Sequence, residues 1–343
     1  MEKLRVVLFG VGAMGSRIAQ FLLEKKGVQV VGAIDIAKQK VGKDLGEVLG
    51  IGKQFGVIVS DDVGGVLSEA KADIVVHATT SFLKDTYPQI SEVVKHGVNV
   101  VSTCEELTYP YVTNSELAEK LDELANKHKV TVLGTGINPG FLMDTLPIML
   151  TVVCQKIEKI KVTRVMNAAT RRVPFQKKIG AGLTVQEFKT KIEKKFITGH
   201  VGLKQSVAVI ADALAWKLDK IEVNSVEPLV AKKRVESQAI KVRVGQVAGL
   251  RQRARGVRKG KEVVTLDFQA YIGAEEEYDS ITIEGVPNIH EKISPCVHGD
   301  VGTVAVIVNS IPKVINAPPG LLTMKDLPVP SAALGDMRKH VRK

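Results

Sequence analysis

The sequence predicts an α/β protein with two domains: a doubly wound parallel sheet, then an α+β domain with a mostly antiparallel sheet. A length of 343 residues is too great for one ordinary core and suits two. Up to residue 135, short apolar runs alternate with helical stretches, which is typical of a parallel sheet covered by helices. After Pro147 strand patterns follow one another with few helices between them, which favours antiparallel pairing.

In the first domain, expected to span residues 1–147, short apolar runs predict six buried strands and amphipathic periodicity predicts the helices between them. The predicted strands are 6–9, 28–34, 57–60, 74–78, 98–102 and 130–134, and the predicted helices are 16–26, 87–96 and 115–129. Right-handed crossovers between these strands give helices on both faces of the sheet.

The second domain, expected at residues 148–298, is predicted to bind substrate and to form a dimer interface. Its predicted strands are 156–168, 222–227, 238–247, 262–272 and 279–284, and its predicted helices are 185–195 and 203–218. Residues 299–343 are predicted to return and pack on the first domain, beginning with a helix at 301–308.

The composition argues against several classes of function. No apolar run reaches the ~20 residues that span a bilayer, and the first residues lack a signal-peptide pattern, so we expect no membrane segment and a cytoplasmic protein. The three cysteines show no CxxC spacing, so no metal site is expected. The net charge is +11, but the basic run at 251–261 is broken by glycines and lacks aromatic residues. We interpret this run as a solvated hairpin end and expect no nucleic-acid partner.

A glycine-rich motif lies between the first predicted strand and the first helix, where residues 10–15 read GVGAMG. Gly10 permits a tight turn, Gly12 lets the backbone approach a pyrophosphate, and Gly15 allows close packing of the helix on the sheet. The backbone of Ala13 and Met14 opens the helix, whose free N–H groups attract anions. The motif therefore predicts a Rossmann domain that binds NAD or NADP.

The end of the second strand carries Asp35, twenty residues after Gly15. A carboxylate there accepts hydrogen bonds from the ribose hydroxyls of NAD. Lys38 and Lys40 lie close enough in sequence to meet the 2′-phosphate of NADP, so we expect NAD to be preferred and NADP to be tolerated. At the carboxyl end of the fourth strand, the residues Ala78, Thr79 and Thr80 are predicted to line the cofactor. The alternative is that this segment only caps the next helix.

An acidic pair, Glu105 and Glu106, follows the fifth strand at the same sheet edge as the nicotinamide. A glutamate that is partly desolvated there has a pKa shifted toward neutrality and can exchange protons during a reaction. We favour Glu105 as the catalytic group because it is nearer the strand end, and keep Glu106 as its substitute. The alternative is that both carboxylates only complement a helix dipole.

Substrate contacts are expected from two places. After the sixth strand, the segment 134–141 is rich in glycine: its Asn138 offers a donor and an acceptor, and Phe141 can exclude water, although a plain hinge would look similar. In the second domain, candidates for a substrate carboxylate are Arg164, Arg171, Arg172 and His200. Arg164 and His200 are the preferred pair, since the planar fork of an arginine matches two carboxylate oxygens.

Several of these segments together resemble the 2,4-diaminopentanoate dehydrogenase and native amine dehydrogenase family, which is related to dihydrodipicolinate reductase. They are GVGAMG at 10–15, GAID at 32–35, NVVSTCEEL at 99–107, GTGINPGF at 134–141, GHVGL at 199–203 and HGDVGT at 298–303. The resemblance extends along essentially the whole chain, and STCEEL and GINPGF are its more discriminating parts. It implies that Glu105 is the active-site glutamate, that Asn138, Arg164 and His200 contact the substrate, and that Thr303 approaches it.

The resemblance implies an NAD(P)-dependent oxidative deamination of 2,4-diaminopentanoate at C4, giving 2-amino-4-oxopentanoate and ammonia, with reductive amination of ketones as the reverse reaction. It also implies a small-molecule substrate and a homodimer. Three alternatives remain: a homoserine dehydrogenase, a dihydrodipicolinate reductase-like oxidoreductase, and a nonenzymatic NAD(H)-responsive regulator. The first is disfavoured because Glu105 and Glu106 stand where its pattern has a lysine, and the second because its paired histidines and lysine motif are missing from the second domain.

Overall fold

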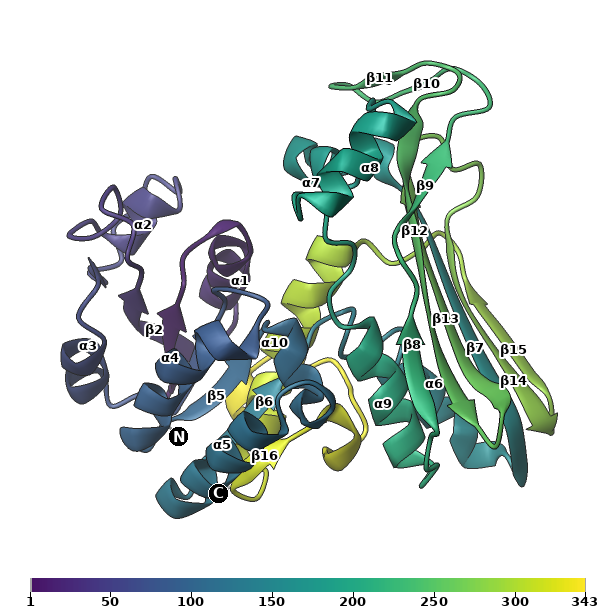
Figure 1. The fold of residues 1–343 in the computed structure, drawn as a ribbon. Coiled ribbons are helices and arrows are strands. Elements are labelled where there is room, and N and C mark those ends of the chain that lie inside the picture. Colours follow the sequence, from purple (N-terminus) through teal and green to yellow (C-terminus); the bar gives the residue numbers. More distant parts are fainter. Residues whose placement is uncertain (1, 343) are drawn as a thin grey trace. The chain divides into compact units, whose positions relative to one another are not determined.

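A computed structural model describes residues 2–342, and the chain divides into two compact units (Figure 1). Unit 1 consists of Met1–Phe141 and Gly299–Lys343, and unit 2 consists of Leu142–His298. No helix within the described residues is long and apolar enough to cross a membrane.

Unit 1 is built on a seven-stranded sheet in which every pair of neighbours is parallel. The strands are β1 (Leu4–Phe9), β2 (Val28–Ile34), β3 (Val59–Ser60), β4 (Ile74–His77), β5 (Asn99–Ser102), β6 (Thr131–Gly134) and β16 (Gly320–Leu322). Their order is β16-β6-β5-β4-β1-β2-β3, so the direction of winding reverses between β1 and β4. Ligands of doubly wound sheets bind at the carboxyl ends of the strands beside such a reversal.

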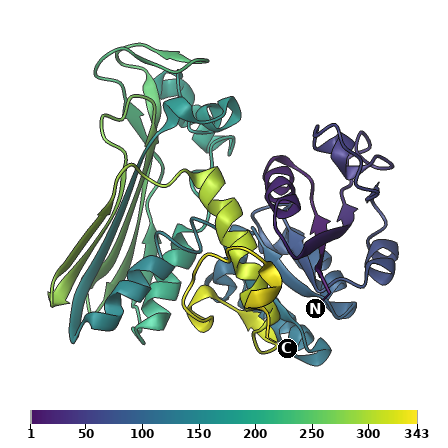
Figure 2. The ribbon, with the colours of Figure 1, turned by 180° about the vertical axis from the view of Figure 1, so that it is seen from behind.

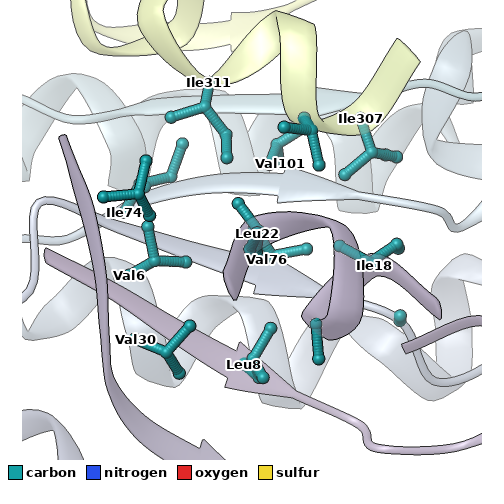
Figure 3. Close-up of a cluster of buried hydrophobic side chains, with 14 of the residues drawn as sticks. Val6, Leu8, Ile18, Leu22, Val30, Ile74, Val76, Val101, Ile307 and Ile311 are labelled. Atoms are coloured by element: carbon teal, nitrogen blue, oxygen red, sulfur yellow. The ribbon is translucent and has the colours of Figure 1, made fainter. Parts of the chain in front are cut away.

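Helices cover both faces of this sheet, because successive residues of each buried strand point to opposite sides. The helices of unit 1 are α1 (Ala13–Leu23), α2 (Leu45–Val48), α3 (Val63–Ala70), α4 (Leu83–Lys95), η1 (Glu105–Thr108), η2 (Pro110–Val112), α5 (Ser115–His128), α10 (Gly299–Ile315), η5 (Met324–Asp326) and η6 (Met337–His340). Val6 and Leu8 pack with Ile18 of α1 and Ile307 of α10 in one apolar cluster (Figure 3). Val7 belongs to the cluster on the opposite face, with residues of α3, α4 and α5.

The C-terminal segment completes unit 1 in two ways. Helix α10 packs beside α1, and β16 adds a strand parallel to β6. The predicted helix at 301–308 is therefore present but longer at both ends. The strand β16 was not predicted, because three residues after Pro318 and Pro319 are too few to show a periodicity.

Unit 2 is built on a mixed sheet with the order β15-β14-β7-β13-β12-β8, and β9 also pairs with β12. Its strands are β7 (Lys156–Asn167), β8 (Lys220–Val223), β9 (Glu227–Val230), β12 (Val247–Arg258), β13 (Lys261–Tyr271), β14 (Tyr278–Val286) and β15 (Ile289–Ile293). β7 and β13 are parallel, and the other pairs of this sheet are antiparallel. A two-stranded ribbon, β10 (Val235–Glu236) and β11 (Lys241–Val242), lies apart from it.

One face of this sheet is apolar and covered, and we call it the inner face. The helical segments of unit 2 are α6 (Thr145–Leu150), η3 (Thr151–Val153), η4 (Ala168–Thr170), α7 (Val173–Lys178), α8 (Val185–Glu193) and α9 (Leu203–Ala213). Helix α9 lies along the inner face in both views (Figures 1 and 2), and its Val207 and Ile210 are buried with Leu266 of β13.

The structure corrects the bounds of two expected strands and the position of the domain boundary. The strand expected at 222–227 is two strands, β8 and β9, because the chain leaves the sheet between them. Most of the strand expected at 238–247 is loop; the paired residues are β11 and Val247, the first residue of β12. The expected domain boundary at 147 and 148 falls inside α6, whereas the two units divide between Phe141 and Leu142, since Met143 and Leu146 pack in the core of unit 2.

The basic run lies along the body of strand β12 rather than at a hairpin end. Leu250, Gln252, Ala254 and Gly256 of β12 are buried and face inward, so the arginines between them share the outer face. There they form ion pairs with neighbouring strands: Arg251 with Asp267, Arg253 with Glu227, and Arg255 with Glu222. Only the last part, from Arg258 to Lys261, forms the turn into β13.

Candidate active site

Backbone hydrogen bonds continue past the strand ends of unit 1 and hold the loops at one sheet edge. The bonds join Gly10 N to Ile34 O (2.8 Å), Ala78 N to Phe9 O (2.7 Å), Thr103 N to His77 O (2.9 Å) and Thr135 N to Ser102 O (2.9 Å). Each loop is thus fixed to the neighbouring strand as it leaves the sheet. The loops after β1, β4, β5 and β6, which carry most of the predicted site residues, therefore share the carboxyl edge.

The glycine turn has the shape that a pyrophosphate requires. Gly10 has a φ of +94°, and a Cβ there would lie 2.4 Å from Ala78 O, so only glycine fits. A Cβ on Gly15 would lie 1.9 Å from Gly10 O, which shows how closely α1 packs on the turn. A Cβ on Gly12 would meet nothing within 4 Å, so this side is open to a ligand. Gly12 is the N-cap residue of α1 and makes no side-chain hydrogen bond to the start of the helix. A helix start of this kind, with the N–H groups of Ala13 and Met14, suits a dinucleotide phosphate.

Asp35 lies beside this turn at the end of β2. Its carboxylate accepts hydrogen bonds from Val11 N (2.9 Å), Ala37 N (2.9 Å) and the Lys40 ammonium (2.8 Å). Burial alone would raise the pKa of Asp35, but the bond from Lys40 and the two backbone bonds outweigh it and lower the pKa below the usual value. Asp35 is therefore a carboxylate at neutral pH.

A cavity of about 450 Å³ opens beside Gly12 and Lys40. It is lined by Val11, Gly12, Ala13, Ser16, Gln39, Lys40, Lys43, Glu47 and Val48. Lys38 is exposed and does not line it. Of the two lysines weighed for a 2′-phosphate, only Lys40 thus faces this part of the turn.

The loop after β4 is not a helix cap. Thr79 donates a hydrogen bond to Gln89 Oε1 (2.9 Å) and lies 3.1 Å from His77 Nε2. Ala78 packs against Gly10, and Thr80 is exposed at the same edge. The N-terminal residue of α4, Leu83, is instead capped from outside this loop.

The two adjacent glutamates have different surroundings. Glu106 Oε2 accepts hydrogen bonds from Leu83 N (2.8 Å) and Asn114 Nδ2 (3.1 Å), so its carboxylate caps α4. Glu105 is half-buried at the start of η1, three residues after the end of β5. Gly134 holds η1 against the sheet, because a Cβ there would lie 2.5 Å from the carbonyl carbon of Leu107. Glu106 therefore caps α4, whereas Glu105 lies at the carboxyl edge of the sheet, on the segment that follows β5.

The loop after β6 is closed on itself and held by α10. Gly140 has a φ of +125°, and a Cβ there would lie 2.4 Å from Gly136 N. Thr303 Oγ1 of α10 accepts a hydrogen bond from Ile137 N (3.4 Å), which places Thr303 on this loop. Asn138 and Phe141, both half-buried, belong to the same loop.

In unit 2, three polar side chains and one phenylalanine form a row across the otherwise apolar inner face. Strand register places Gln252, Phe268, Arg164 and Asp279 side by side on four neighbouring strands. Arg164 is 1% exposed, and its Nη1 donates to Asp279 Oδ1 (2.7 Å). Burial raises the pKa of Asp279, although the Arg164 charge opposes this. Buried polar groups on an apolar sheet face require partners and often mark a functional site.

The arginine pair also holds the backbone of Val297. Arg164 Nη2 donates to Val297 O, and Val297 N donates to Asp279 Oδ2 (2.9 Å). Both terminal nitrogens of Arg164 thus have partners inside unit 2. The structure gives Arg164 a positioning role that the sequence did not indicate.

His200 completes this row at its other end. The imidazole ring stacks on Phe268, with centroids 4.4 Å apart and planes 3° from parallel, and the backbone N–H of His200 donates to Gln252 Oε1 (2.8 Å). Burial, with smaller contributions from the charges of Lys178 and Arg164, lowers the pKa of His200 to about 3. His200 is therefore a neutral hydrogen-bonding group at physiological pH.

The structure separates the other candidates from this row. The Arg171 guanidinium lies over the Phe175 ring, 4.9 Å from its centroid, and Arg172 is exposed at the start of α7. Asp279 and Gln252 were missed, since their cross-strand partners are far away in sequence. No group of three or more histidine, cysteine, aspartate or glutamate side chains in residues 2–342 could hold a metal ion.

Comparison with known proteins decides the family. Residues 141–343 match the 2,4-diaminopentanoate dehydrogenase C-terminal domain, and residues 4–134 match the dihydrodipicolinate reductase N-terminus. The 2,4-diaminopentanoate dehydrogenase of Acetoanaerobium sticklandii is 38% identical over 98% of this chain and 97% of its own length. The chain belongs to the 2,4-diaminopentanoate dehydrogenase family.

Two further matches agree with this membership. The structure of an amine dehydrogenase from Mycobacterium smegmatis has a TM-score of 0.82 and 32% identity, covering 96% of this chain and 97% of that one. A 4-hydroxy-tetrahydrodipicolinate reductase of Moorella thermoacetica is 29% identical over only 43% of this chain and 50% of its own length. This member of the 2,4-diaminopentanoate dehydrogenase family is an oxidoreductase, so the regulator without enzymatic activity is excluded.

Proposed function

We propose that this enzyme catalyses the NAD(P)-dependent oxidative deamination of 2,4-diaminopentanoate at C4. The substrate and water give 2-amino-4-oxopentanoate and ammonia as the cofactor is reduced, and the reverse reaction is a reductive amination. The observation that carries the proposal is that two neighbouring carboxylates at the sheet edge, Glu105 and Glu106, have different surroundings. Glu106 caps α4, and Glu105 begins η1 at the carboxyl edge of the sheet, where we place the proton acceptor.

The cofactor is held by the glycine turn and its neighbours. The N–H groups of Ala13 and Met14 would hold the pyrophosphate, Asp35 would accept hydrogen bonds from the ribose hydroxyls, and Ala78, Thr79 and Thr80 would border the nicotinamide end. When bound, the nicotinamide supplies the hydride acceptor, which no side chain can provide. The chain's task is to place the substrate carbon and the proton acceptor.

Glu105 acts as the general base. It takes the proton that the substrate ammonium must lose before hydride can leave C4, and it then orients the water that attacks the resulting iminium carbon. Asn138 contributes a donor and an acceptor to the polar end of the reacting group, and Phe141 excludes bulk water. Thr303 keeps the loop of Asn138 in place through its bond with Ile137.

Unit 2 recognises the substrate's carboxylate. Arg164 provides positive charge on the inner face, and neutral His200 offers a ring N–H. Because Asp279 and Val297 already occupy both terminal nitrogens of Arg164, its contribution is to charge and to the position of the row.

Both nucleotides are accepted, with NAD preferred. Asp35 is charged and suits the 2′-hydroxyl of NAD, whereas the adjacent Lys40 offsets the repulsion between Asp35 and the 2′-phosphate of NADP. We further propose that the enzyme acts in the cytoplasm as a homodimer, formed through the outer face of the unit 2 sheet. Light scattering would measure this oligomeric state.

The test is to incubate the enzyme with 2,4-diaminopentanoate and either nucleotide. The absorbance of reduced cofactor, ammonia and the keto product are measured together, and their amounts are expected to rise in a 1:1:1 ratio. 4-Hydroxy-tetrahydrodipicolinate with reduced cofactor serves as the comparison substrate. No turnover of diamino acids or simple amines, or turnover of the comparison substrate alone, would contradict the proposal.

A further inference from the structure

His77, the last residue of β4, lies in a buried polar network of unit 1. Its side chain is fully buried, with Nδ1 2.9 Å from Ser102 Oγ and Nε2 2.8 Å from Gln89 Oε1. The ring also meets Phe9 edge to face, with centroids 5.3 Å apart. A buried imidazole with both nitrogens satisfied is fixed in one orientation.

The partners determine which nitrogen carries the proton. Gln89 Oε1 can only accept, so Nε2 of His77 is the donor. Nδ1 then has a free lone pair and accepts the hydroxyl hydrogen of Ser102. Burial lowers the pKa of His77 to about 4, although the bond to Gln89 opposes this, so the ring stays neutral in this tautomer.

Each side of the ring leads to a different part of the candidate site. On the Nδ1 side, Ser102 Oγ accepts a hydrogen bond from Cys104 N (3.1 Å), and Cys104 directly precedes Glu105. On the Nε2 side, Gln89 Oε1 also accepts a hydrogen bond from the hydroxyl of Thr79. The methyl group of Thr79 borders the glycine turn at Gly10.

We propose that His77 is a positioning residue that aligns Glu105 through Ser102 and aligns the cofactor edge through Gln89 and Thr79. This inference rests on the proposed function, because it takes Glu105 as the proton acceptor. The network has two arms, Ser102 on the Nδ1 side of the ring and Gln89 with Thr79 on the Nε2 side, and they affect two different kinetic quantities. The Ser102 arm governs the rate of the proton-coupled step, and the Gln89 arm governs cofactor affinity.

Two substitutions of His77 separate the arms. Asparagine places an amide oxygen where Nδ1 lies and keeps the acceptor for Ser102, whereas glutamine extends an amide N–H to where Nε2 lies and keeps the donor for Gln89. We expect His77→Asn to keep kcat near that of the wild type and to weaken binding of the reduced cofactor. We expect His77→Gln to keep cofactor affinity and to lose kcat by ~10²-fold, the cost of a misplacement of about 1 Å.

The measurements are kcat and KM for 2,4-diaminopentanoate, and the Kd of the reduced nucleotide from its fluorescence. Ser102→Ala and Gln89→Leu cut the same two arms outside the ring and are expected to reproduce the two effects separately. They also keep the inference testable if a His77 variant does not fold. A purely structural role would lower the melting temperature of all four variants without any split between kcat and Kd, and that result would overturn the inference.

The inference and the proposed function fail in different ways. A wild type that turns over the amine, with variants that show no split, overturns only the role of His77. A wild type without amine turnover contradicts the proposed function itself. A kcat that falls in Ser102→Ala, with unchanged Kd, supports both.

Discussion

The Lys40 ammonium lies 2.8 Å from a carboxylate oxygen of Asp35 and 2.9 Å from the carbonyl oxygen of Val11. One cation thus joins the acidic end of β2 to the glycine turn after β1. Because the 2′-oxygen of the adenosine ribose is expected beside Asp35, this ion pair lies where NAD and NADP differ.

Lys40→Ala should therefore change the choice of nucleotide. Removing the ammonium leaves Asp35 to repel a 2′-phosphate, so kcat/KM for NADP should fall at least about tenfold relative to NAD. Steady-state kinetics with both nucleotides measures the ratio. Lys38→Ala is the control, since Lys38 is exposed and outside the cavity. An unchanged ratio in Lys40→Ala would rule out this role.

Glu106→Ala should reduce stability because α4 loses its cap. The expected decrease in the free energy of unfolding is about 1 kcal/mol, the usual cost of a lost cap. Glu106→Gln keeps an acceptor for Leu83 N and should lose less. Urea unfolding of both variants gives the comparison. If Glu106→Ala were as stable as the wild type, the carboxylate would not be a cap.

The ion pair of Arg164 and Asp279 should be essential to unit 2. Arg164→Met leaves a buried carboxylate without its cation and should cost about 3–5 kcal/mol of unfolding free energy. Asp279→Leu added to Arg164→Met removes that charge, so the double variant should be more stable than the single one. If the single variant proved as stable as the wild type, Asp279 would not depend on Arg164.

The folded double variant also tests whether the Arg164–Asp279 pair contributes to substrate binding. Its KM for 2,4-diaminopentanoate should exceed that of the wild type by about tenfold or more, because the variant loses the Arg164 guanidinium and the hydrogen bonds with which the pair orders this row. KM for a simple amine without a carboxylate should change much less. Equal changes for both substrates would contradict carboxylate recognition by the Arg164 row.

Stability should depend on pH through His77. Its pKa is about 4 in the folded protein and about 6.5 when unfolded, so the unfolded state binds more protons between these values. Stability is therefore fully present above pH ~6.5 and is lost as pH falls toward 4, by up to about 1.4 kcal/mol per pH unit. His200 acts in the same direction. The slope in urea titrations between pH 4 and 6.5 should be smaller in His77→Asn; an equal slope would refute the assignment.

The sequence predicted most of the architecture of unit 1 because local patterns control it. The spacing of Gly10, Gly12 and Gly15 predicts the turn, and the positive φ of Gly10 and the close backbone contacts of Gly10 and Gly15 explain why glycine is required there. The buried strand β2 has the predicted bounds. By contrast, β16 pairs with β6, which is far away in sequence, and its three residues are too few to show a strand pattern.

The candidate site was less predictable, since contacts distant in sequence determine it. Glu105 and Glu106 are chemically identical neighbours, and only the position of Leu83 N shows which one caps a helix. Arg164 was expected to be available to a substrate, but Asp279, 115 residues later, engages it. Strand register in unit 2 creates this pair, and no local pattern encodes that register.

The central claim is that Glu105 accepts the proton in amine oxidation, and turnover of Glu105→Gln tests it most directly. Glutamine keeps the shape of the side chain but cannot act as a base, so kcat for 2,4-diaminopentanoate should fall by ~10²–10⁴-fold. The Kd of the reduced nucleotide should stay unchanged, and Glu106→Gln should keep nearly full activity. A Glu105→Gln enzyme with wild-type kcat, or a Glu106→Gln enzyme with the larger loss, would contradict the account.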